Sequence, residues 1–242
     1  MWLQTKLPEK IFLIFNADLC TYNGNANLFG PGFSSPLQQT KMRNAISFCM
    51  DATHDVYQGV DVIMYTLLIS DEEICRGWPV AYMITNDQTV APIVQWLQFL
   101  KSSNVLVYPK QFTIDCCKAE VRAISTVFPQ ASIQYCVFHV LQAWGRKTDI
   151  VCKAPSGIPA ENKLLRTAIR RALSKIVYEN DLETFHQKIN QFIVDYAAHG
   201  ELINYLRRNW FREDVMKVWS RAYHGNQFSH MLTNNYIESW HN

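Results

Sequence analysis

Two isolated aspartates that follow apolar, strand-like runs are the residues of this chain best suited to metal chemistry. Asp51 comes after the apolar run 45–50, and Asp115 comes after the run 111–114. Each could simply begin a turn or cap the next helix, but α/β sheets present functional side chains at strand ends. If the two strands are neighbours, the carboxylates converge and repel each other unless a divalent cation or a proton lies between them. Such oxygen ligands suit Mg²⁺ or Mn²⁺ rather than zinc.

A third carboxylate, Glu238, lies near the end of the sequence. Thr233 or Asn234 can cap a helix that carries Glu238 in its second turn. Taken alone, this segment indicates only a surface glutamate on a terminal helix.

The elements that must position these carboxylates follow from the hydrophobic pattern. Three strand-like runs with short polar connections indicate a meander. A helix that Thr89 can cap, another strand, a helix over 116–128 and a last strand come next. This series predicts an α/β fold with a mixed five-stranded sheet and flanking helices. The predicted strands are residues 45–51, 62–70, 78–85, 111–115 and 132–136.

The rest of the chain differs from this core in composition and in hydrophobic periodicity. Residues 20–40 are rich in Gly, Asn, Pro and Ser, which predicts irregular structure. After about residue 145 the apolar period is helical throughout, which predicts an all-helical block. The predicted organisation is an irregular segment at 1–41, a core at 42–145, a helical block at 146–232 and the start of a final helix at 233–242.

Four short motifs, in this order, resemble the landmarks of Mutator-like (MULE) DNA transposases. The resemblance covers roughly residues 42–242, and the helical block before the last motif is in keeping with it. It implies an RNase H-like core in which Asp51, Asp115 and Glu238 form a DDE triad that binds two Mg²⁺ or Mn²⁺ ions. The helical block is then an insertion before the last catalytic helix. The motifs are Asp51-Ala52-Thr53, Phe112-Thr113-Ile114-Asp115, Cys136-Val137-Phe138-His139 and Thr233-Asn234-Asn235-Tyr236-Ile237-Glu238-Ser239.

The resemblance implies a nuclear enzyme that cleaves and transfers DNA strands, with transposon ends and target DNA as partners; a homo-oligomer is left open. The attacking group is water or a DNA 3′-hydroxyl, and two metal ions about 4 Å apart activate it and stabilise the leaving oxygen. The alternative is a catalytically inactive, transposase-derived DNA-binding or regulatory protein, or an inert truncated relic. That alternative is favoured by the lack of a zinc-finger region before residue 42 and of a Cys/His zinc module after Glu238. The final helix is expected to be cut short at Asn242.

Cys136 and His139 are candidates for an auxiliary role. Residues three apart share a helix face, but these two make only half of the four ligands of a zinc site, so no zinc is predicted. The family motif suggests that His139 contacts a phosphate or the scissile region. A buried thiol beside a packed imidazole is an equally good interpretation.

A basic stripe, defined as Lys163, Arg166, Arg170, Arg171 and Lys175, opposes the apolar face of a predicted helix and is not interrupted by acidic residues. It is either a solvated face or a row of phosphate contacts. Four tryptophans could stack on an unpaired base, although aromatics beside apolar stripes more often belong to a core. They are Trp144, Trp210, Trp219 and Trp240.

The composition excludes several other classes. With 242 residues, 48% hydrophobic, the chain can bury a core without disulfides. A net charge of +2 gives no general argument for nucleic acid, although the excess positive charge lies in residues 126–242. The longest apolar run, residues 11–15, is too short to span a membrane. Seven cysteines without a CxxC pair favour a reducing, intracellular compartment.

Overall fold

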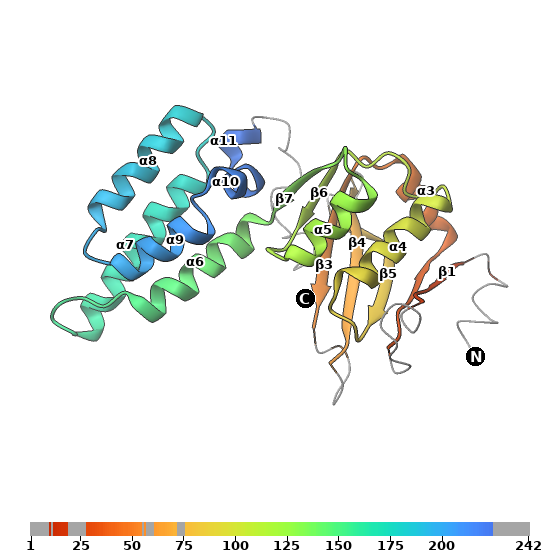
Figure 1. Ribbon diagram of the computed structural model, residues 1–242, viewed down its shortest axis with the longest axis horizontal. Helices are drawn as coiled ribbons and strands as arrows, with labels where there is room; N and C mark the ends of the chain where they lie inside the picture. Colours follow the sequence, from red (N-terminus) through yellow and green to blue (C-terminus); the bar gives the residue numbers. More distant parts are fainter. Residues whose placement is uncertain are drawn as a thin grey trace. The chain divides into compact units, whose positions relative to one another are not determined.

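The protein is α/β, as its periodicity predicts. The computed structural model describes residue 10 and residues 12–18, 28–54, 56, 61–71 and 76–224. This part of the chain divides into two compact units, the first ending at Gln134 and the second beginning at Tyr135. The first unit holds a sheet with helices, and the second is helical (Figure 1).

Among the described residues, seven strands form one mixed sheet in the order β1-β2-β5-β4-β3-β6-β7. β3, β4 and β5 form the predicted antiparallel meander, and β6 joins β3 in parallel. A parallel pair needs a long crossover connection, and the segment that contains helix α4 provides it. The strands are β1 (Leu13–Asn16), β2 (Pro31–Ser34), β3 (Ser47–Thr53), β4 (Ile63–Asp71), β5 (Arg76–Thr85), β6 (Gln111–Ile114) and β7 (Ser132–Tyr135).

The prediction of an irregular segment over residues 1–41 was wrong for β1 and β2, which extend the sheet beyond the five predicted strands. β1 pairs with β2, and β2 pairs with β5, both antiparallel. Pro31 is tolerated because it is the first residue of its strand. A Cβ atom on Gly32 would lie 2.7 Å from the Tyr82 carbonyl oxygen, so the glycine permits the close approach of β2 to β5.

Helix α3 (Pro36–Asn44) also begins inside the segment predicted to be irregular. Ser35 and Gln38 form a capping box: the Ser35 N–H donates to Gln38 Oε1 at 2.8 Å, and the Gln38 N–H donates to Ser35 Oγ at 3.4 Å. The Ser35-Pro36 step, in the segment predicted to be irregular, is therefore the start of a helix, with proline in the first turn where its missing N–H costs nothing.

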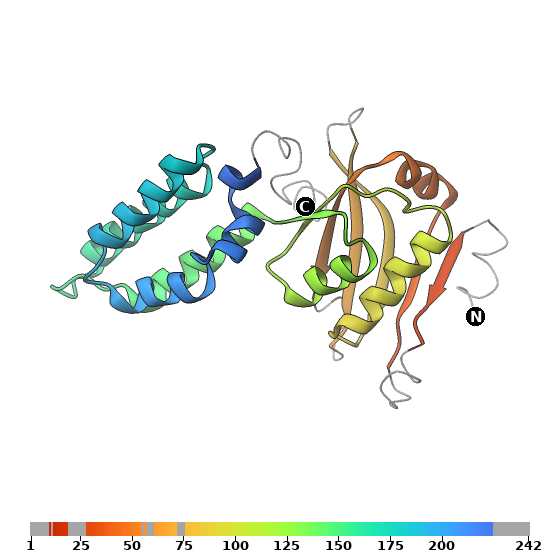
Figure 2. The same cartoon turned by 45° about the horizontal axis from the view of Figure 1, so that its top comes forward.

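Helices α4 (Val90–Ser102) and α5 (Lys118–Val127) pack beside each other over one face of the sheet. Figure 2 shows them in yellow and green over the strands. Their buried residues include Trp96 and Ile124. Phe48 on β3 stacks on Phe112 on β6, with 5.6 Å between ring centroids, and Phe112 stacks on Phe128, the C-cap of α5, at 5.8 Å. The even-numbered residues of β3 and β6 therefore face α5.

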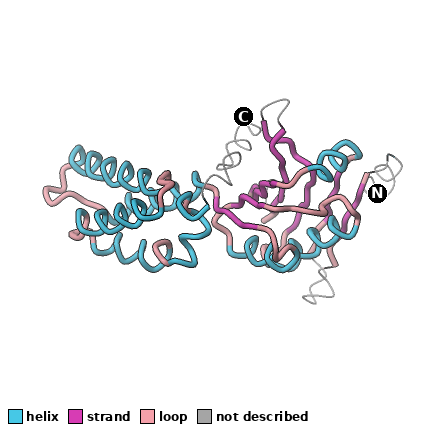
Figure 3. The backbone as a smooth tube through the Cα atoms, turned by 90° about the horizontal axis from the view of Figure 1, so that it is seen from above, coloured by secondary structure: helices cyan, strands magenta, loops and turns pink. Residues whose placement is uncertain are grey.

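The second unit consists of helices and loops from Val137 to the end of the described chain (Figure 3). Helix α6 runs through the predicted boundary at residues 145 and 146, so the helical unit begins earlier than expected. The reason is packing: α6 lies against α7 and α9, and Trp144 is fully buried. None of the helices in the described ranges is long and apolar enough to cross a membrane. The helices are α6 (Val137–Val151), α7 (Pro159–Val177), α8 (Leu182–Asp195), α9 (Gly200–Asn209), α10 (Glu213–Trp219) and α11 (Arg221–His224).

Candidate metal centre

Asp51 and Asp115 occupy matching positions on two adjacent parallel strands. The register of β3 and β6 pairs Cys49 with Thr113 and Met50 with Ile114. Asp51 and Asp115 are the residues that follow this last pair, and Asp115 lies just beyond the end of β6. Because neighbouring strands are about 4.8 Å apart, the end of this ladder brings the two residues near each other. Asp51 lies within β3, rather than at its end as the sequence suggests, and Asp115 directly follows β6.

The Asp51 side chain lies on the sheet face opposite α4 and α5. Successive side chains of a strand point to opposite faces, and Phe48 and Met50 belong to the face that α5 covers. Asp51 therefore shares the other face with Cys49 and Thr53. Asp51 is 9% exposed, and Asp115 is half-buried. A carboxylate as buried as that of Asp51 requires compensating contacts.

Two threonines, Thr53 and Thr66, are neighbours of Asp51 in the sheet. The Thr53 hydroxyl donates a hydrogen bond to Asp51 Oδ2 at 3.3 Å. Thr66, on β4, is directly opposite Asp51 in the antiparallel register. Thr66 is 1% exposed, and its hydroxyl makes no hydrogen bond within the described structure. In the sequence, Thr66 is marked only by being the single threonine in the apolar run of β4, and it was not among the predicted site residues.

A further acidic residue, Glu120, lies in the first turn of α5 and is fully buried. Burial and the nearby Glu120 charge raise the pKa of Tyr65 on β4 and of the Cys117 thiol. A smaller contribution from Asp115 acts on Cys117 in the same direction. Sequence analysis missed Glu120 because it interrupts the apolar face of α5; an acid at the third position of a helix was the available signal.

The third predicted ligand, Glu238, lies outside the described residues, as does Trp240. Within the described ranges there is no cluster of three or more His, Cys, Asp or Glu residues arranged to hold a metal ion. The described part of the site is therefore a pair of carboxylates with two threonines as neighbours of one of them. Such a pair can share a hard divalent cation through oxygen atoms.

Cys136 and His139 lie at the start of α6, in the second unit. Cys136 is the N-cap residue and is fully buried; its carbonyl accepts a hydrogen bond from the Val140 N–H at 3.1 Å. The His139 ring is half-buried and meets the Phe138 ring edge-on at 5.3 Å. This arrangement agrees with the interpretation of a buried thiol beside a packed imidazole. The auxiliary role of Cys136 and His139 in catalysis stays a prediction.

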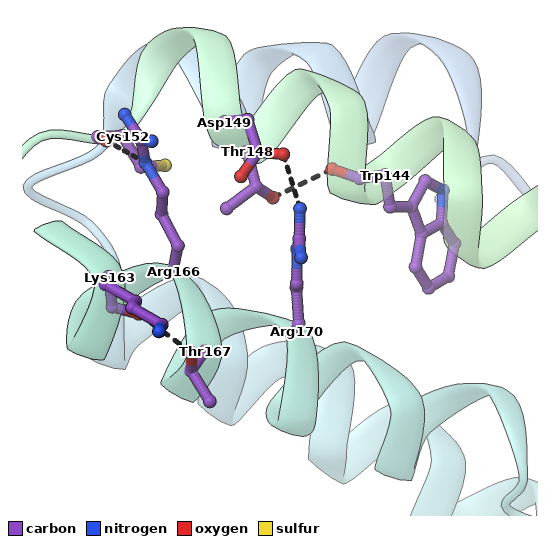
Figure 4. Close-up of polar contacts among 8 residues, drawn as sticks. All are labelled: Trp144, Thr148, Asp149, Cys152, Lys163, Arg166, Thr167 and Arg170. Carbon is purple, nitrogen blue, oxygen red and sulfur yellow. Dashed lines mark hydrogen bonds and ion pairs between the residues drawn. The ribbon is translucent and has the colours of Figure 1, made fainter.

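Two members of the basic stripe on α7 contact helix α6, and the other three are exposed to solvent (Figure 4). Arg166 reaches across to α6, where its Nε–H donates to the Cys152 carbonyl at 3.0 Å, and Arg170 forms an ion pair with Asp149. These two side chains therefore join α6 to α7, and Arg166 satisfies a carbonyl at the C-terminal end of α6. The other three members, Lys163, Arg171 and Lys175, are exposed.

A groove of about 620 Å³ runs between α6 and α7. Phe138 and Leu141 contribute apolar surface, Arg146 and Arg171 contribute positive charge, and Arg170 is paired with Asp149, which also lines the groove. Gly145 lies beside the Arg170 guanidinium: a Cβ atom there would be 3.4 Å from Arg170 Nε, which is ordinary van der Waals contact. Cationic side chains around a groove are what a phosphate backbone requires.

Three of the four tryptophans belong to the core of the helical unit. Trp144 and Trp219 are fully buried and Trp210 is 7% exposed. Trp144 meets Trp219 edge-on at 5.0 Å and Trp210 at 5.8 Å. The Trp219 indole N–H donates to the Trp210 carbonyl at 3.0 Å. These side chains therefore cannot stack on a DNA base without unfolding the unit.

Comparison of the chain with protein-family models finds no match, and comparison with curated proteins finds none.

Proposed function

We propose that this chain is the catalytic domain of a DNA transposase of the Mutator-like type, with an RNase H-like core that cleaves and transfers DNA strands. The observation that carries the proposal is the parallel register of β3 and β6, whose last pair, Met50 and Ile114, is followed on each chain segment by an aspartate, Asp51 and Asp115. In this proposal, Asp51, Asp115 and Glu238 form the carboxylate triad.

The electrostatics of the pair support a cation site. Two ionised carboxylates that lie close together repel each other. The low exposure of Asp51 limits how far water can screen that repulsion. A divalent cation between the two groups removes the repulsion, and oxygen-only ligands fit Mg²⁺ or Mn²⁺. Thr66 adds a buried hydroxyl with unused hydrogen-bonding capacity at the same place.

The architecture agrees with this proposal. The five strands β5, β4, β3, β6 and β7 are contiguous in the sheet and include both antiparallel and parallel pairs. A helical unit follows β7, where the family resemblance expects an insertion. β1 and β2 lie at the opposite edge from β6 and β7, so they leave the Asp51–Asp115 pair unchanged.

Each residue has a defined task in the proposed reaction. Asp51 and Asp115 would hold the cations, with Glu238 as the third carboxylate of the triad. Thr53 restrains the Asp51 carboxylate through its hydrogen bond. When bound, two divalent ions activate the attacking water or 3′-hydroxyl and neutralise the leaving oxygen.

The direct test is nicking of supercoiled plasmid DNA by the purified chain. We expect relaxed circles with Mg²⁺ or Mn²⁺ and none when EDTA is present. DNA binding without nicking would instead support the inactive, regulatory alternative. A folded protein that neither binds nor nicks DNA would support the relic alternative.

The basic stripe gives a second prediction. Replacing Arg171 and Lys175 together with glutamine should weaken DNA binding regardless of sequence, because both exposed cations are free to meet phosphates. The slope of log affinity against log salt concentration should fall in magnitude by about 2, close to 0.9 per lost phosphate contact. Fluorescence anisotropy over a range of salt concentrations measures both effects.

The matched control is replacement of Arg207 and Arg208 with glutamine. These residues are exposed on α9, so the double variant has the same net charge but an intact stripe. Its salt slope should stay near that of the unmodified chain. A DNA affinity that does not depend on salt, or that is unchanged by neutralising the stripe, would argue against phosphate contacts on α7.

A further inference from the structure

The Thr66 hydroxyl is a buried polar group that makes no hydrogen bond to the described residues. Thr66 lies in the middle of β4, is 1% exposed, and its Oγ1 atom has no hydrogen-bond partner in the described structure. A buried hydroxyl without a partner lowers stability relative to an apolar side chain of the same shape. Valine at this position would therefore suit the fold better.

The surroundings of Thr66 point to one partner. Its cross-strand neighbours are Asp51 on β3 and Tyr82 on β5. Its neighbours on the same face of β4 are Met64 and Leu68, which are apolar. The Tyr82 ring is tilted against Phe33, with 5.2 Å between centroids. Asp51 is therefore the carboxylate that directly faces Thr66, and directly opposite residues in an antiparallel pair have Cβ atoms about 5 Å apart.

We propose that Thr66 is a positioning residue for the divalent-cation site, an inference that rests on the proposed function of Asp51 and Asp115. One Asp51 oxygen turns toward the cation shared with Asp115, and the other accepts a hydrogen bond from the Thr66 hydroxyl. Thr53 holds the carboxylate from its own strand, and Thr66 holds it from the neighbouring strand. Hydrogen bonds of this kind orient metal ligands and contribute strongly to metal affinity.

The test compares Thr66→Val with Thr66→Ser in the full chain. Mn²⁺ binding is measured by isothermal titration calorimetry, and folding is measured by thermal unfolding without metal. Thr66→Val should bind Mn²⁺ about tenfold or more weakly, while its unfolding temperature without metal should not fall. Thr66→Ser keeps the hydroxyl and should retain most of the affinity. Thr66→Ala provides a second variant without the hydroxyl if Thr66→Val does not fold.

Thr85→Val is the contrasting control. The Thr85 hydroxyl donates to the Phe29 carbonyl at 2.7 Å and accepts from the Asp87 N–H at 3.0 Å, so its loss should lower stability. Because Thr85 lies on the other face of the sheet, Mn²⁺ affinity should not change. If Thr66 had a purely structural role, Thr66→Val would likewise lower stability and leave Mn²⁺ affinity unchanged.

Two results would overturn the inference, and they can be told apart. If Asp51→Asn abolishes Mn²⁺ binding but Thr66→Val and Thr66→Ala bind as tightly as the unmodified chain, Thr66 has no positioning role and the carboxylate site stands. If the unmodified chain binds no Mn²⁺, or Asp51→Asn binds it equally well, the proposed function fails together with the role of Thr66.

Discussion

Asp51→Asn and Asp115→Asn should each reduce metal-dependent nicking about 1,000-fold or more while leaving the protein folded. Asparagine keeps the shape of the side chain but removes one charge from the pair that faces across β3 and β6. Loss of about 4 kcal/mol of stabilisation by a bound metal corresponds to about a 1,000-fold loss of rate. The measurement is the initial rate of plasmid relaxation at saturating Mg²⁺, with circular dichroism as the check on folding.

The stability of these variants gives an independent readout. Without metal, each substitution removes repulsion between two neighbouring carboxylates, so the unfolding temperature should stay the same or rise. Asp195→Asn is the control, because Asp195 is exposed on α8 in the other unit. It should nick DNA at the rate of the unmodified chain. An Asp51→Ala protein that still nicks DNA with Mg²⁺ would refute the assignment of Asp51.

Much of the sheet was predictable because its strands have distinct hydrophobic patterns. The predicted runs at 62–70 and 78–85 correspond to β4 and β5, and the predicted cap Thr89 is the N-cap of α4. β2 was missed because a four-residue strand that contains proline and glycine has the composition of a loop, and β1 pairs only with β2 among the described strands. The pairing of β2 with β5 depends on a close approach to Tyr82, which local sequence does not reveal.

The site was predictable only in part, for a related reason. Asp51 and Asp115 stand out because each follows an apolar run, but the register that sets them side by side is a property of the folded sheet. Thr66 becomes notable only when β4 pairs with β3 and brings it opposite Asp51. On α7, spacing predicted one basic stripe, whereas packing against α6 directs Arg166 and Arg170 toward helix contacts.

Trp219→Ala should destabilise the helical unit by about 3–5 kcal/mol, the cost expected for removing a large buried aromatic side chain. Trp219 is fully buried, meets Trp144 at 5.0 Å and Phe185 at 5.6 Å, and donates its indole N–H to the Trp210 carbonyl. The truncation leaves a cavity and also deprives that buried carbonyl of its donor. Urea unfolding followed by helical circular dichroism measures the loss.

Two further substitutions separate a core role from a DNA-stacking role. Trp219→Phe keeps most of the packing but loses the indole N–H, so its loss of stability should be smaller than that of alanine. Tyr178→Ala removes an aromatic ring that is 45% exposed at the end of α7 and should change stability by less than about 0.5 kcal/mol. If Trp219→Ala were as stable as the unmodified chain but bound DNA more weakly, Trp219 would be a base-stacking residue. The Trp219 ring packs edge-on against Trp144 inside the helical unit. We therefore expect the opposite: Trp219→Ala should lower stability, and folded Trp219→Phe should bind DNA as tightly as the unmodified chain.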